Sequence, residues 1–442
     1  MSSRPRAAVL MMQELKTLDA WLAHIESLHA KPIDMGLARM HELVKRLDIR
    51  FECPVFVVGG TNGKGSTCSM LEAILRSAGY RVGLHTSPHL LRFNERARLD
   101  GAQASDEQLI EQFAAVEAAR GDITLSYFEF TALAILRLFQ TARLDAVVLE
   151  IGLGGRLDAI NVIDADVAII TSVDLDHVDY LGHTREAIGL EKAHIYRTGR
   201  PAICADPQPP QSLIDYAREV DADLWLFGRD FNYSGDKQQW AYGGRSQRRA
   251  ALPYPALRGA NQLLNAAGAI AALEAIGARL PVSQAAVREG LLRVEIPGRF
   301  QILPGQPAII LDVAHNPHAA AVLAQNLDAM AYHPSTHAVF GMLADKDIAA
   351  VVGKIGARVD HWHVASLPGP RGTSASQLSE ILRAAGVSPA AITSYADVES
   401  ALVAAQVAVE PADRIVVFGS FLTVAAAMQA LALQRAQRRD QT

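Results

Sequence analysis

The chain has 442 residues, half of them hydrophobic and a fifth charged, which is the composition of a globular protein with sizeable cores. Its formal charge of −5 argues against general affinity for nucleic acid or anionic membranes, and no apolar stretch approaches the length of a membrane span. Cys53, Cys68 and Cys204 lie far apart, which excludes a disulfide framework or a zinc finger and indicates a reducing, cytoplasmic compartment.

Helical and strand-like segments alternate along the chain. Amphipathic helices are expected at residues 13–30 and 36–48, where apolar side chains recur at helical spacing. Short runs rich in β-branched residues follow at 54–58, 146–151, 166–173, 308–314, 337–342 and 413–419. Strands that are covered by helices on both faces read as continuous apolar runs, so this pattern predicts a doubly wound α/β fold.

A domain boundary is expected near residues 296–300, which read Ile-Pro-Gly-Arg-Phe. Two helical stretches, 261–277 and 283–293, precede it, and a fresh series of strands and helices follows. We therefore expect an N-terminal domain at 1–296 and a C-terminal domain at 297–442. Residues 206–258, rich in Pro, Gln, Tyr and Trp, predict a small β excursion or surface hairpins within the first domain.

A glycine-rich loop, GGTNGKGST at residues 59–67, joins the strand at 54–58 to a helix. Its glycines let backbone N–H groups approach phosphate oxygens, and the helix N-terminus adds partial positive charge. Lys64 supplies a point charge, and Ser66 or Thr67 can coordinate through a hydroxyl, although Gly65 breaks the usual GxxxxGK[ST] spacing. A solvated glycine-rich turn is the plain alternative. The context favours a nucleotide site, in an ATP-using enzyme or a nucleotide-gated switch; an N-K-x-D motif of guanine switches is absent.

Further motifs follow in a fixed order: TSPHLLRFNER at 86–96, YFEFT at 127–131, LEIGLGGRLDA at 149–159, DHVDYLG at 176–182, EKA at 191–193, PGRF at 297–300, LDVAHNP at 311–317 and GS at 419–420. Together with the glycine-rich loop they resemble the bacterial dihydrofolate synthase/folylpolyglutamate synthase family, a branch of the Mur-ligase-like ATP-dependent amide ligases, over about residues 15–430. The resemblance implies a P-loop parallel-sheet domain that binds ATP and pterin or folate. It also implies a Rossmann-like C-terminal domain that contributes to ATP and glutamate binding.

The resemblance also implies a reaction. ATP would phosphorylate a substrate carboxylate, and the α-amine of L-glutamate would attack the acyl phosphate, because phosphate turns a poor electrophile into one with a leaving group. The acceptors would be 7,8-dihydropteroate and reduced folates, and the enzyme is expected to be a monomer. A monofunctional folylpolyglutamate synthase, a Mur-type ligase of peptidoglycan precursors, and an ATP-responsive module without turnover are the alternatives.

Four side chains are expected to carry catalysis by this resemblance: Lys64, Glu150, His177 and Lys192. Ser87, Glu150 and His177 would bind the Mg²⁺ that bridges the ATP phosphates, and a carbamylated Lys192 would bind a second Mg²⁺. Taken alone, these residues read as a turn serine, a strand-end carboxylate, a satisfied histidine and a solvated helix lysine. A buried amine with a lowered pKa can, however, be partly neutral and capture CO₂.

The remaining expected contacts also come from the resemblance. Nucleotide contacts are implied at Thr61, Asn62, Gly63, Lys64, Gly65, Ser66, Asn265, Arg299 and Asp312, and glutamate contacts at His315 and Ser420. Pterin or folate contacts are implied at Ile33, Asp34, Met35, Ser126, Tyr127, Phe128, Glu129 and Asp158. Phe128 can stack on a flat ring, and a carboxylate can pair with an aminopyrimidine edge. Core packing and helix capping are the plain alternatives.

Overall fold

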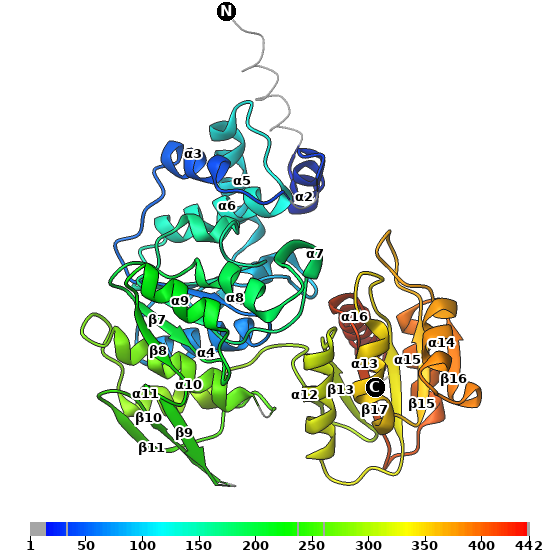
Figure 1. Cartoon of the computed structure of the whole chain (residues 1–442). Coiled ribbons are helices and arrows are strands. Elements are labelled where there is room, and N and C mark those ends of the chain that lie inside the picture. The colour runs from blue at the N-terminus through cyan, green and yellow to red at the C-terminus, as the bar shows by residue number, and fades with distance from the viewer. Residues whose placement is uncertain (1–14, 32–33, 237, 260, 440–442) are drawn as a thin grey trace, which may run out of the picture. The chain divides into compact units, whose positions relative to one another are not determined.

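The computed structural model describes residues 15–31, 34–236, 238–259 and 261–439, and the chain divides into two compact units (Figure 1). Unit 1 contains the chain up to His89, then Phe93–Pro255 and Leu263–Val294. Unit 2 contains Leu90–Arg92, Ala256–Gln262 and the chain from Glu295 onward. No helix within the described ranges is both long enough and apolar enough to cross a membrane.

Unit 1 is built on an eight-stranded sheet of order β4-β3-β2-β5-β1-β6-β7-β8. Its strands are β1 (Val55–Gly59), β2 (Val82–His85), β3 (Ala97–Leu99), β4 (Ala102–Gln103), β5 (Ala146–Glu150), β6 (Val167–Ile170), β7 (Pro201–Cys204) and β8 (Asp223–Leu226). In this spatial order, the neighbouring strands β2, β5, β1, β6, β7 and β8 all pair in parallel. At the other end of the sheet, β3 and β4 form an antiparallel edge. Every residue of β1, β2, β5 and β6 is buried, which explains their continuous apolar sequences.

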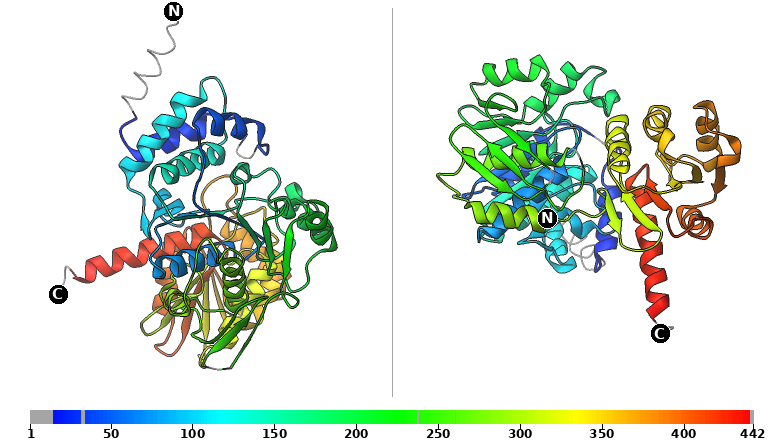
Figure 2. Two further views of the ribbon diagram at one scale, coloured as in Figure 1. Left: turned by 90° about the vertical axis from the view of Figure 1, so that its left-hand side faces the viewer. Right: turned by 90° about the horizontal axis from the view of Figure 1, so that it is seen from below.

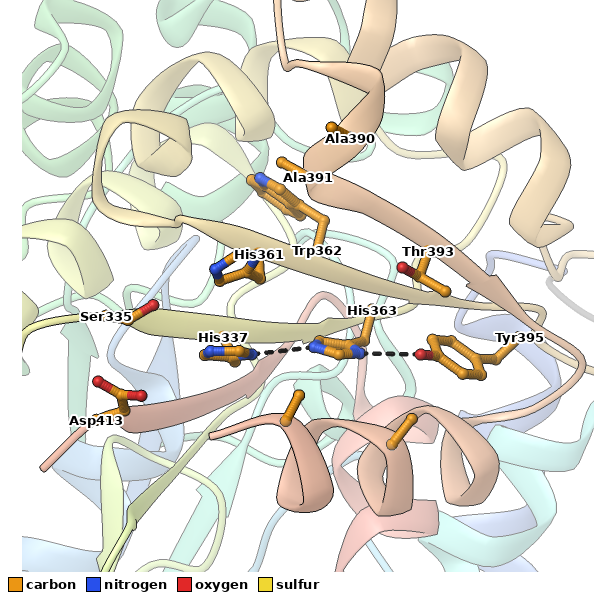
Figure 3. Close-up of a pocket in the computed structure, with 12 residues that line it drawn as sticks. Ser335, His337, His361, Trp362, His363, Ala390, Ala391, Thr393, Tyr395 and Asp413 are labelled. Atoms are coloured by element: carbon orange, nitrogen blue, oxygen red, sulfur yellow. Dashed lines mark hydrogen bonds between the residues drawn. The ribbon is translucent and has the colours of Figure 1, made fainter. Parts of the chain in front are cut away.

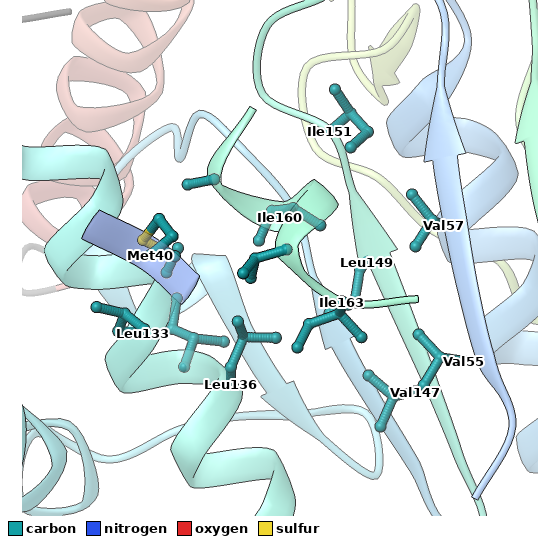
Figure 4. Close-up of a cluster of buried hydrophobic side chains, with 14 of the residues drawn as sticks. Met40, Val55, Val57, Leu133, Leu136, Val147, Leu149, Ile151, Ile160 and Ile163 are labelled. Carbon is teal, nitrogen blue, oxygen red and sulfur yellow. The ribbon is translucent and has the colours of Figure 1, made fainter. Parts of the chain in front are cut away.

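The helices of unit 1 pack partly on this sheet and partly on one another. They are α2 (Leu18–Ser27), α3 (Ala38–Arg46), α4 (Lys64–Ser77), α5 (Asp106–Arg120), α6 (Tyr127–Thr141), α7 (Val178–Leu181), α8 (Arg185–Ala193), α9 (Gln211–Glu219), α10 (Gln262–Ala275) and α11 (Gln284–Arg293), with 3₁₀ turns η1 (Phe93–Arg96) and η2 (Ala159–Val162). Figure 4 shows part of the core, in which Met40 of α3, Leu133 of α6, Ile160 of η2 and Val147 of β5 belong to one apolar cluster.

The segment 206–258 is more regular than its composition predicted. The expected β excursion is confirmed as an antiparallel sheet of β9 (Asn232–Gly235), β10 (Trp240–Gly243) and β11 (Arg248–Leu252). The helix α9 and the edge strand β8 were not expected from the sequence. Pro210 precedes α9, whose apolar side is short, with Leu213 and Ala217 as its buried residues.

Unit 2 contains a six-stranded sheet of order β12-β13-β17-β14-β15-β16. Its strands are β12 (Gln301–Leu303), β13 (Ala308–Asp312), β14 (Thr336–Phe340), β15 (His361–Ala365), β16 (Ile392–Tyr395) and β17 (Arg414–Phe418). All pairs are parallel except β12 with β13. The strands β15 and β16 were not expected, because polar residues interrupt both.

Helices cover both faces of the second sheet. They are α12 (Pro317–Asp328), α13 (Ile348–Ile355), α14 (Ala375–Ala384), α15 (Val398–Ala408) and α16 (Phe421–Arg439), with 3₁₀ turns η3 (Gly356–Arg358) and η4 (Pro389–Ala391). One apolar cluster joins the sheet to α12, α13 and α14, and another joins it to α15 and α16. Figure 2 shows the ribbon of these elements in yellow to red from two further sides. The predicted fold class is confirmed: a P-loop parallel-sheet unit and a Rossmann-like unit.

Candidate active site

The carboxyl ends of four adjacent strands in unit 1 bring many of the predicted residues together. The strand order β2-β5-β1-β6 places the segment after β2, which contains Ser87, beside Glu150, the last residue of β5. The P-loop follows β1, and the segment leading to His177 follows β6. Ligands of open α/β sheets bind at such an edge, where neighbouring strands lead to helices on opposite faces.

The P-loop is held in place by the segment after β6. Gly63 adopts a left-handed conformation (φ 89°) as the N-cap of α4, so the helix begins at Lys64. The Asn62 N–H donates to Ser172 Oγ at 3.0 Å, and Thr171 Oγ1 donates to the Asn62 carbonyl at 2.6 Å. Lys64 Nζ folds back and donates to the Gly60 carbonyl at 3.1 Å. The loop therefore presents a helix N-terminus and an ammonium group, which together suit phosphate.

Two other predicted nucleotide contacts lie at the loop. The Thr61 hydroxyl donates to the Asp174 carbonyl at 3.1 Å, so it anchors the loop to the β6 segment. Asn265 comes from α10, yet a Cβ added to Gly63 would lie 2.4 Å from its Oδ1. Its amide is therefore packed directly against the turn that starts α4.

The predicted metal ligands Ser87 and Glu150 are neighbours. The Ser87 N–H donates to Glu150 Oε2 at 3.1 Å, and that oxygen lies 3.7 Å from the position of a Cβ at Gly65. The Glu150 side chain thus lies between the Ser87 turn and the first turn of α4, and the residue is 4% exposed. His177 is the residue before the short helix α7, in a left-handed backbone conformation, and its side chain is about one-third exposed.

The donor set of the predicted Mg²⁺ site mixes residue types. Within the ranges that the structure describes, no group of three or more His, Cys, Asp or Glu side chains could hold a metal ion. The expected set contains only two such residues, Glu150 and His177, and adds the Ser87 hydroxyl. Mg²⁺ usually keeps several waters and takes one or two carboxylates together with substrate phosphates, so this sparse donor set fits a metal shared with ATP.

Lys192 is buried, so the alternative of a solvated helix lysine is wrong. It lies in the last turn of α8 and is 4% exposed. Burial, reinforced by the positive charge of Lys64, lowers the pKa of its amine to about 7, although the carboxylates of Asp176 and Asp158 act in the opposite direction. A large fraction of this amine is therefore neutral near pH 7.

The glycine-rich loop after β5 packs on Lys192. A Cβ at Gly155 would lie 2.6 Å from the Glu191 carbonyl oxygen and 3.0 Å from Lys192 Cα, so only glycine fits there. Asp158 closes the loop by accepting N–H groups of Leu153 at 2.8 Å and Ile160 at 3.0 Å. Burial raises the pKa of its carboxyl to about 6, although these hydrogen bonds act to lower that pKa.

Several residues predicted to hold the pterin also lie near this loop. The half-buried Phe128 ring lies against Gly152, where an added Cβ would be 2.7 Å from Phe128 Cζ. Met35 Cε lies 3.8 Å from the position of a Cβ at Gly154. The structure thus brings residues 35, 128 and 152–158 together, while Ile33 lies outside the described residues.

The other predicted pterin residues have structural contacts of their own. Ser126 and Glu129 form a capping box at the start of α6. The Tyr127 ring lies beneath the Arg96 guanidinium, which is 5.5 Å from the ring centroid. Glu129 and Asp34 both bind Arg39, a residue that the sequence did not single out because a charged side chain in the first turn of a helix reads as solvated.

In unit 2, four predicted residues gather at the carboxyl ends of β13 and β17. Asp312 accepts N–H groups of Phe300 at 2.9 Å and Ala314 at 2.8 Å, and burial raises the pKa of its carboxyl to about 6 against the nearby charge of Arg299. The Arg299 guanidinium lies 5.0 Å from the centroid of the Phe421 ring. The centroid of the His315 ring lies 6.0 Å from that same Phe421 centroid. Ser420 is 3% exposed. Phe421 was missed, because an aromatic residue at a helix start usually packs in a core.

A separate cavity in unit 2 lies beside β14, β15 and β16 and is also lined by residues of α15. Its volume is about 400 Å³. Figure 3 shows His337 of β14, His361 and His363 of β15, and Tyr395 of β16 among the residues that line it. His363 Nε2 lies 3.2 Å from His337 Nδ1, and His363 Nδ1 lies 3.2 Å from the Tyr395 hydroxyl. Burial lowers the pKa of His363 to about 4. None of the predicted site residues lines this cavity.

Comparison with known proteins identifies the family. Residues 58–273 match the Mur ligase middle domain, and residues 298–421 match the glutamate ligase domain of Mur ligases. The dihydrofolate synthase/folylpolyglutamate synthase of Escherichia coli K12 is 45% identical over 424 residues, which cover 96% of this chain and 97% of that protein.

Solved structures agree with this match. The structure of E. coli FolC in complex with DHPP and ADP superposes with a TM-score of 0.90 at 45% identity, covering 95% of this chain and 99% of that one. A bifunctional folylpolyglutamate synthase/dihydrofolate synthase with Mn, AMPPNP and L-glutamate bound gives a TM-score of 0.87 at 45% identity, with 94% and 98% covered. The chain therefore belongs to the dihydrofolate synthase/folylpolyglutamate synthase family of Mur-type ligases.

Proposed function

We propose that this protein is an ATP-dependent ligase that joins L-glutamate to 7,8-dihydropteroate, forming dihydrofolate, and adds further glutamates to reduced folates. The observation that carries the proposal is the arrangement in unit 1, where the P-loop, the Ser87–Glu150 pair and the packed Gly63–Asn265 contact share one sheet edge. The near full-length identity to a bifunctional relative supports both activities.

The reaction is an amide synthesis driven by ATP. A carboxylate oxygen of the acceptor attacks the γ-phosphorus, which gives an acyl phosphate and ADP. The α-amine of glutamate then attacks the carbonyl carbon, loses a proton, and phosphate leaves with the former carboxylate oxygen. Positioning and charge stabilisation supply most of the catalysis in such transfers.

The P-loop residues bind the phosphates in this proposal. Backbone N–H groups of residues 61–66 and the Lys64 ammonium face the negative charge of the triphosphate, while Asn265 fixes the turn at Gly63. Asp312 and Arg299 in unit 2 are assigned to the nucleotide, and His315 and Ser420 to glutamate. These assignments give residues 1–296 the ATP and pteridine sites and residues 297–442 a contribution to ATP and glutamate binding.

Ser87, Glu150 and His177 are proposed to hold Mg²⁺, which when bound neutralises phosphate charge during transfer. A divalent ion accompanies AMPPNP in the solved bifunctional relative named above. We propose that Lys192 takes up CO₂ as a carbamate and so provides a second anionic ligand. The lowered pKa and the burial of its amine support this modification, since CO₂ reacts with neutral amines.

The pteridine is assigned to the region of Asp34, Met35, Phe128 and the loop that Asp158 closes. The half-buried Phe128 ring can stack on a flat heterocycle, and its neighbour Gly152 allows close approach of the chain. Ser126, Tyr127 and Glu129 support the start of α6 beneath it. We expect the protein to be a cytoplasmic monomer. Its three cysteines are free thiols, which is consistent with a reducing compartment.

The deciding experiment supplies the full-length protein with ATP, Mg²⁺, glutamate and either 7,8-dihydropteroate or tetrahydrofolate. Glutamate-dependent phosphate release and a product heavier by one glutamyl residue are expected with each acceptor. Turnover with tetrahydrofolate alone would reduce the protein to a monofunctional folylpolyglutamate synthase. No turnover with either acceptor would overturn the proposed function.

A further inference from the structure

Arg39 connects two segments that carry candidate pteridine contacts. It lies in the first turn of α3, and its Nη1 binds Asp34 Oδ2 at 2.6 Å while its Nη2 donates to the Asp34 carbonyl at 3.1 Å. Its Nε donates to Glu129 Oε1 at 3.0 Å, and Nη2 lies 2.9 Å from the same oxygen. One guanidinium thus holds the link before α3 and the start of α6, which are more than ninety residues apart in the chain.

The Glu129 end of this connection is a rigid anchor. Glu129 is 3% exposed, and its second oxygen, Oε2, accepts the Ser126 N–H at 2.8 Å. The Ser126 hydroxyl accepts the Glu129 N–H in return, which completes the capping box of α6. Both carboxylate oxygens of Glu129 are therefore occupied by protein donors, so this residue supports Arg39 and is a poor candidate for contact with substrate.

The Asp34 end is open to a ligand. The Asp34 side chain is 26% exposed, and His29 Nε2 lies 3.1 Å from its Oδ2, the oxygen that Arg39 also binds. Among the described residues, the hydrogen bonds to this carboxylate all go to Oδ2. The hydrogen bond from Arg39 lowers the pKa of Asp34, which keeps the carboxylate ionised and able only to accept.

We infer that Arg39 is a positioning residue for the pteridine: anchored on Glu129, it aims the Asp34 carboxylate at N–H donors of the aminopyrimidine edge. This inference rests on the proposed function and deepens it. An ionised carboxylate suits the adjacent N–H groups of a 2-amino-4-oxopyrimidine ring. Met35, next in the chain, lies beside Gly154, and Gly152 of the same loop lies against the Phe128 ring, so Asp34 belongs to the segment that meets the loop carrying the candidate stacking surface.

Lysine cannot replace arginine in this role. The guanidinium uses three nitrogens in a planar fork to bind Asp34 and Glu129 at once, whereas an ammonium is a single point charge on a flexible stem. Arg39→Lys keeps the charge beside the buried Glu129 but releases Asp34. Affinity for the pteridine should fall, and the steps that depend on the P-loop should change little.

The test measures Michaelis constants for all three substrates in wild type and Arg39→Lys. We expect the KM for 7,8-dihydropteroate to rise about tenfold or more, and those for ATP and glutamate to stay within about twofold. Arg245→Lys is the matched control, because Arg245 likewise bridges two carboxylates, Asp223 at 2.6 Å and Asp230 at 3.1 Å, in the same unit. The control should leave every KM unchanged.

A double-mutant cycle checks that Arg39 acts through Asp34. Asp34→Asn should raise the KM for dihydropteroate, and adding Arg39→Lys to it should raise that KM little further. Should Arg39→Lys fold poorly, Arg39→Met/Glu129→Gln removes both charges together, and its dihydropteroate affinity, measured directly by binding, should be equally weakened.

Three results would overturn the inference: equal rises of KM for all substrates, multiplicative effects in the cycle, or an unchanged KM for dihydropteroate in Arg39→Lys. An inactive wild type would instead overturn the proposed function.

Discussion

The backbone N–H of Ser87 donates to the carboxylate of Glu150 across two adjacent strands, at 3.1 Å. This bond fixes the turn after β2 to the end of β5, and it leaves the carboxylate next to the first turn of α4. The same glutamate oxygen, Oε2, thus accepts the backbone N–H and faces the first turn of α4. Removing the negative charge while keeping an acceptor separates these two roles.

Glu150→Gln provides that separation. The amide oxygen still accepts the Ser87 N–H, so the fold should persist, but a neutral amide is a weak ligand for a hard cation. We expect turnover to fall about a hundredfold and the Mg²⁺ concentration for half-maximal rate to rise. The measurement is phosphate release against Mg²⁺ concentration, with melting temperature as the folding control. A normal Mg²⁺ dependence would remove Glu150 from the metal site.

The role of Lys192 can be tested by chemical rescue. Lys192→Ala removes the amine that would carry the carbamate and leaves a small space in a buried region. We expect turnover to fall about a hundredfold or more, and short carboxylic acids such as acetate to restore part of it by supplying the missing anion. Wild-type activity should depend on dissolved CO₂ after dialysis against CO₂-free buffer. Full activity of Lys192→Ala would contradict the carbamate.

Local sequence was sufficient for the elements that carry strong patterns. The strands β1, β5, β6, β13, β14 and β17 were all expected, because apolar runs of parallel strands need no distant information. The P-loop was readable for the same reason, since strand, glycines, lysine and helix are contiguous. The strand β15 was missed because its histidines line a cavity in place of an apolar core.

Contacts between segments that are distant in the chain could not be predicted from local sequence patterns. Arg39 reads as a surface residue of α3, and only the folded chain places it against Asp34 and Glu129. Lys192 is also a lysine that its own helix sequence would place at the surface. It is buried because the loop around Gly155 packs on it, and the sequence of α8 does not indicate that contact. Motif resemblance supplied Lys192, Asp34 and Glu129, but it did not supply Arg39 or the packing that buries Lys192.

Gly155 gives a prediction about stability and activity together. In Gly155→Ala the new methyl group would meet the Glu191 carbonyl oxygen and Lys192 Cα, both backbone atoms that cannot move independently. We expect a loss of about 1–3 kcal/mol in the free energy of unfolding, with reduced turnover because α8 is displaced. Denaturant titration and initial rates check the two effects.

Gly353→Ala is the matched control for that substitution. Gly353 lies within α13, and nothing lies within 4 Å of the position of its added Cβ. Alanine there should stabilise the protein by about 0.5–1 kcal/mol, because glycine is the poorer helix former. Equal behaviour of the two variants would mean that the loop around Gly155 yields easily and that its packing on α8 is unimportant.

The histidine cavity of unit 2 predicts an acid-sensitive stability. His363 is 6% exposed, and burial lowers its pKa to about 4, while burial and the neighbouring His361 lower the pKa of His337. In the unfolded chain these side chains protonate near pH 6.5, so the unfolded state binds more protons between about pH 6.5 and 4. The free energy of unfolding should therefore fall as the pH decreases through this window.

His363→Asn removes the group with the larger shift. The variant should lose less stability than wild type between pH 6.5 and 4, by about 1–2 kcal/mol after allowance for solvent screening. Urea titration at a series of pH values measures this difference, and His183→Asn, at an exposed histidine, should retain the wild-type slope. Parallel curves for wild type and His363→Asn would show that His363 protonates in the folded protein as easily as in the unfolded chain.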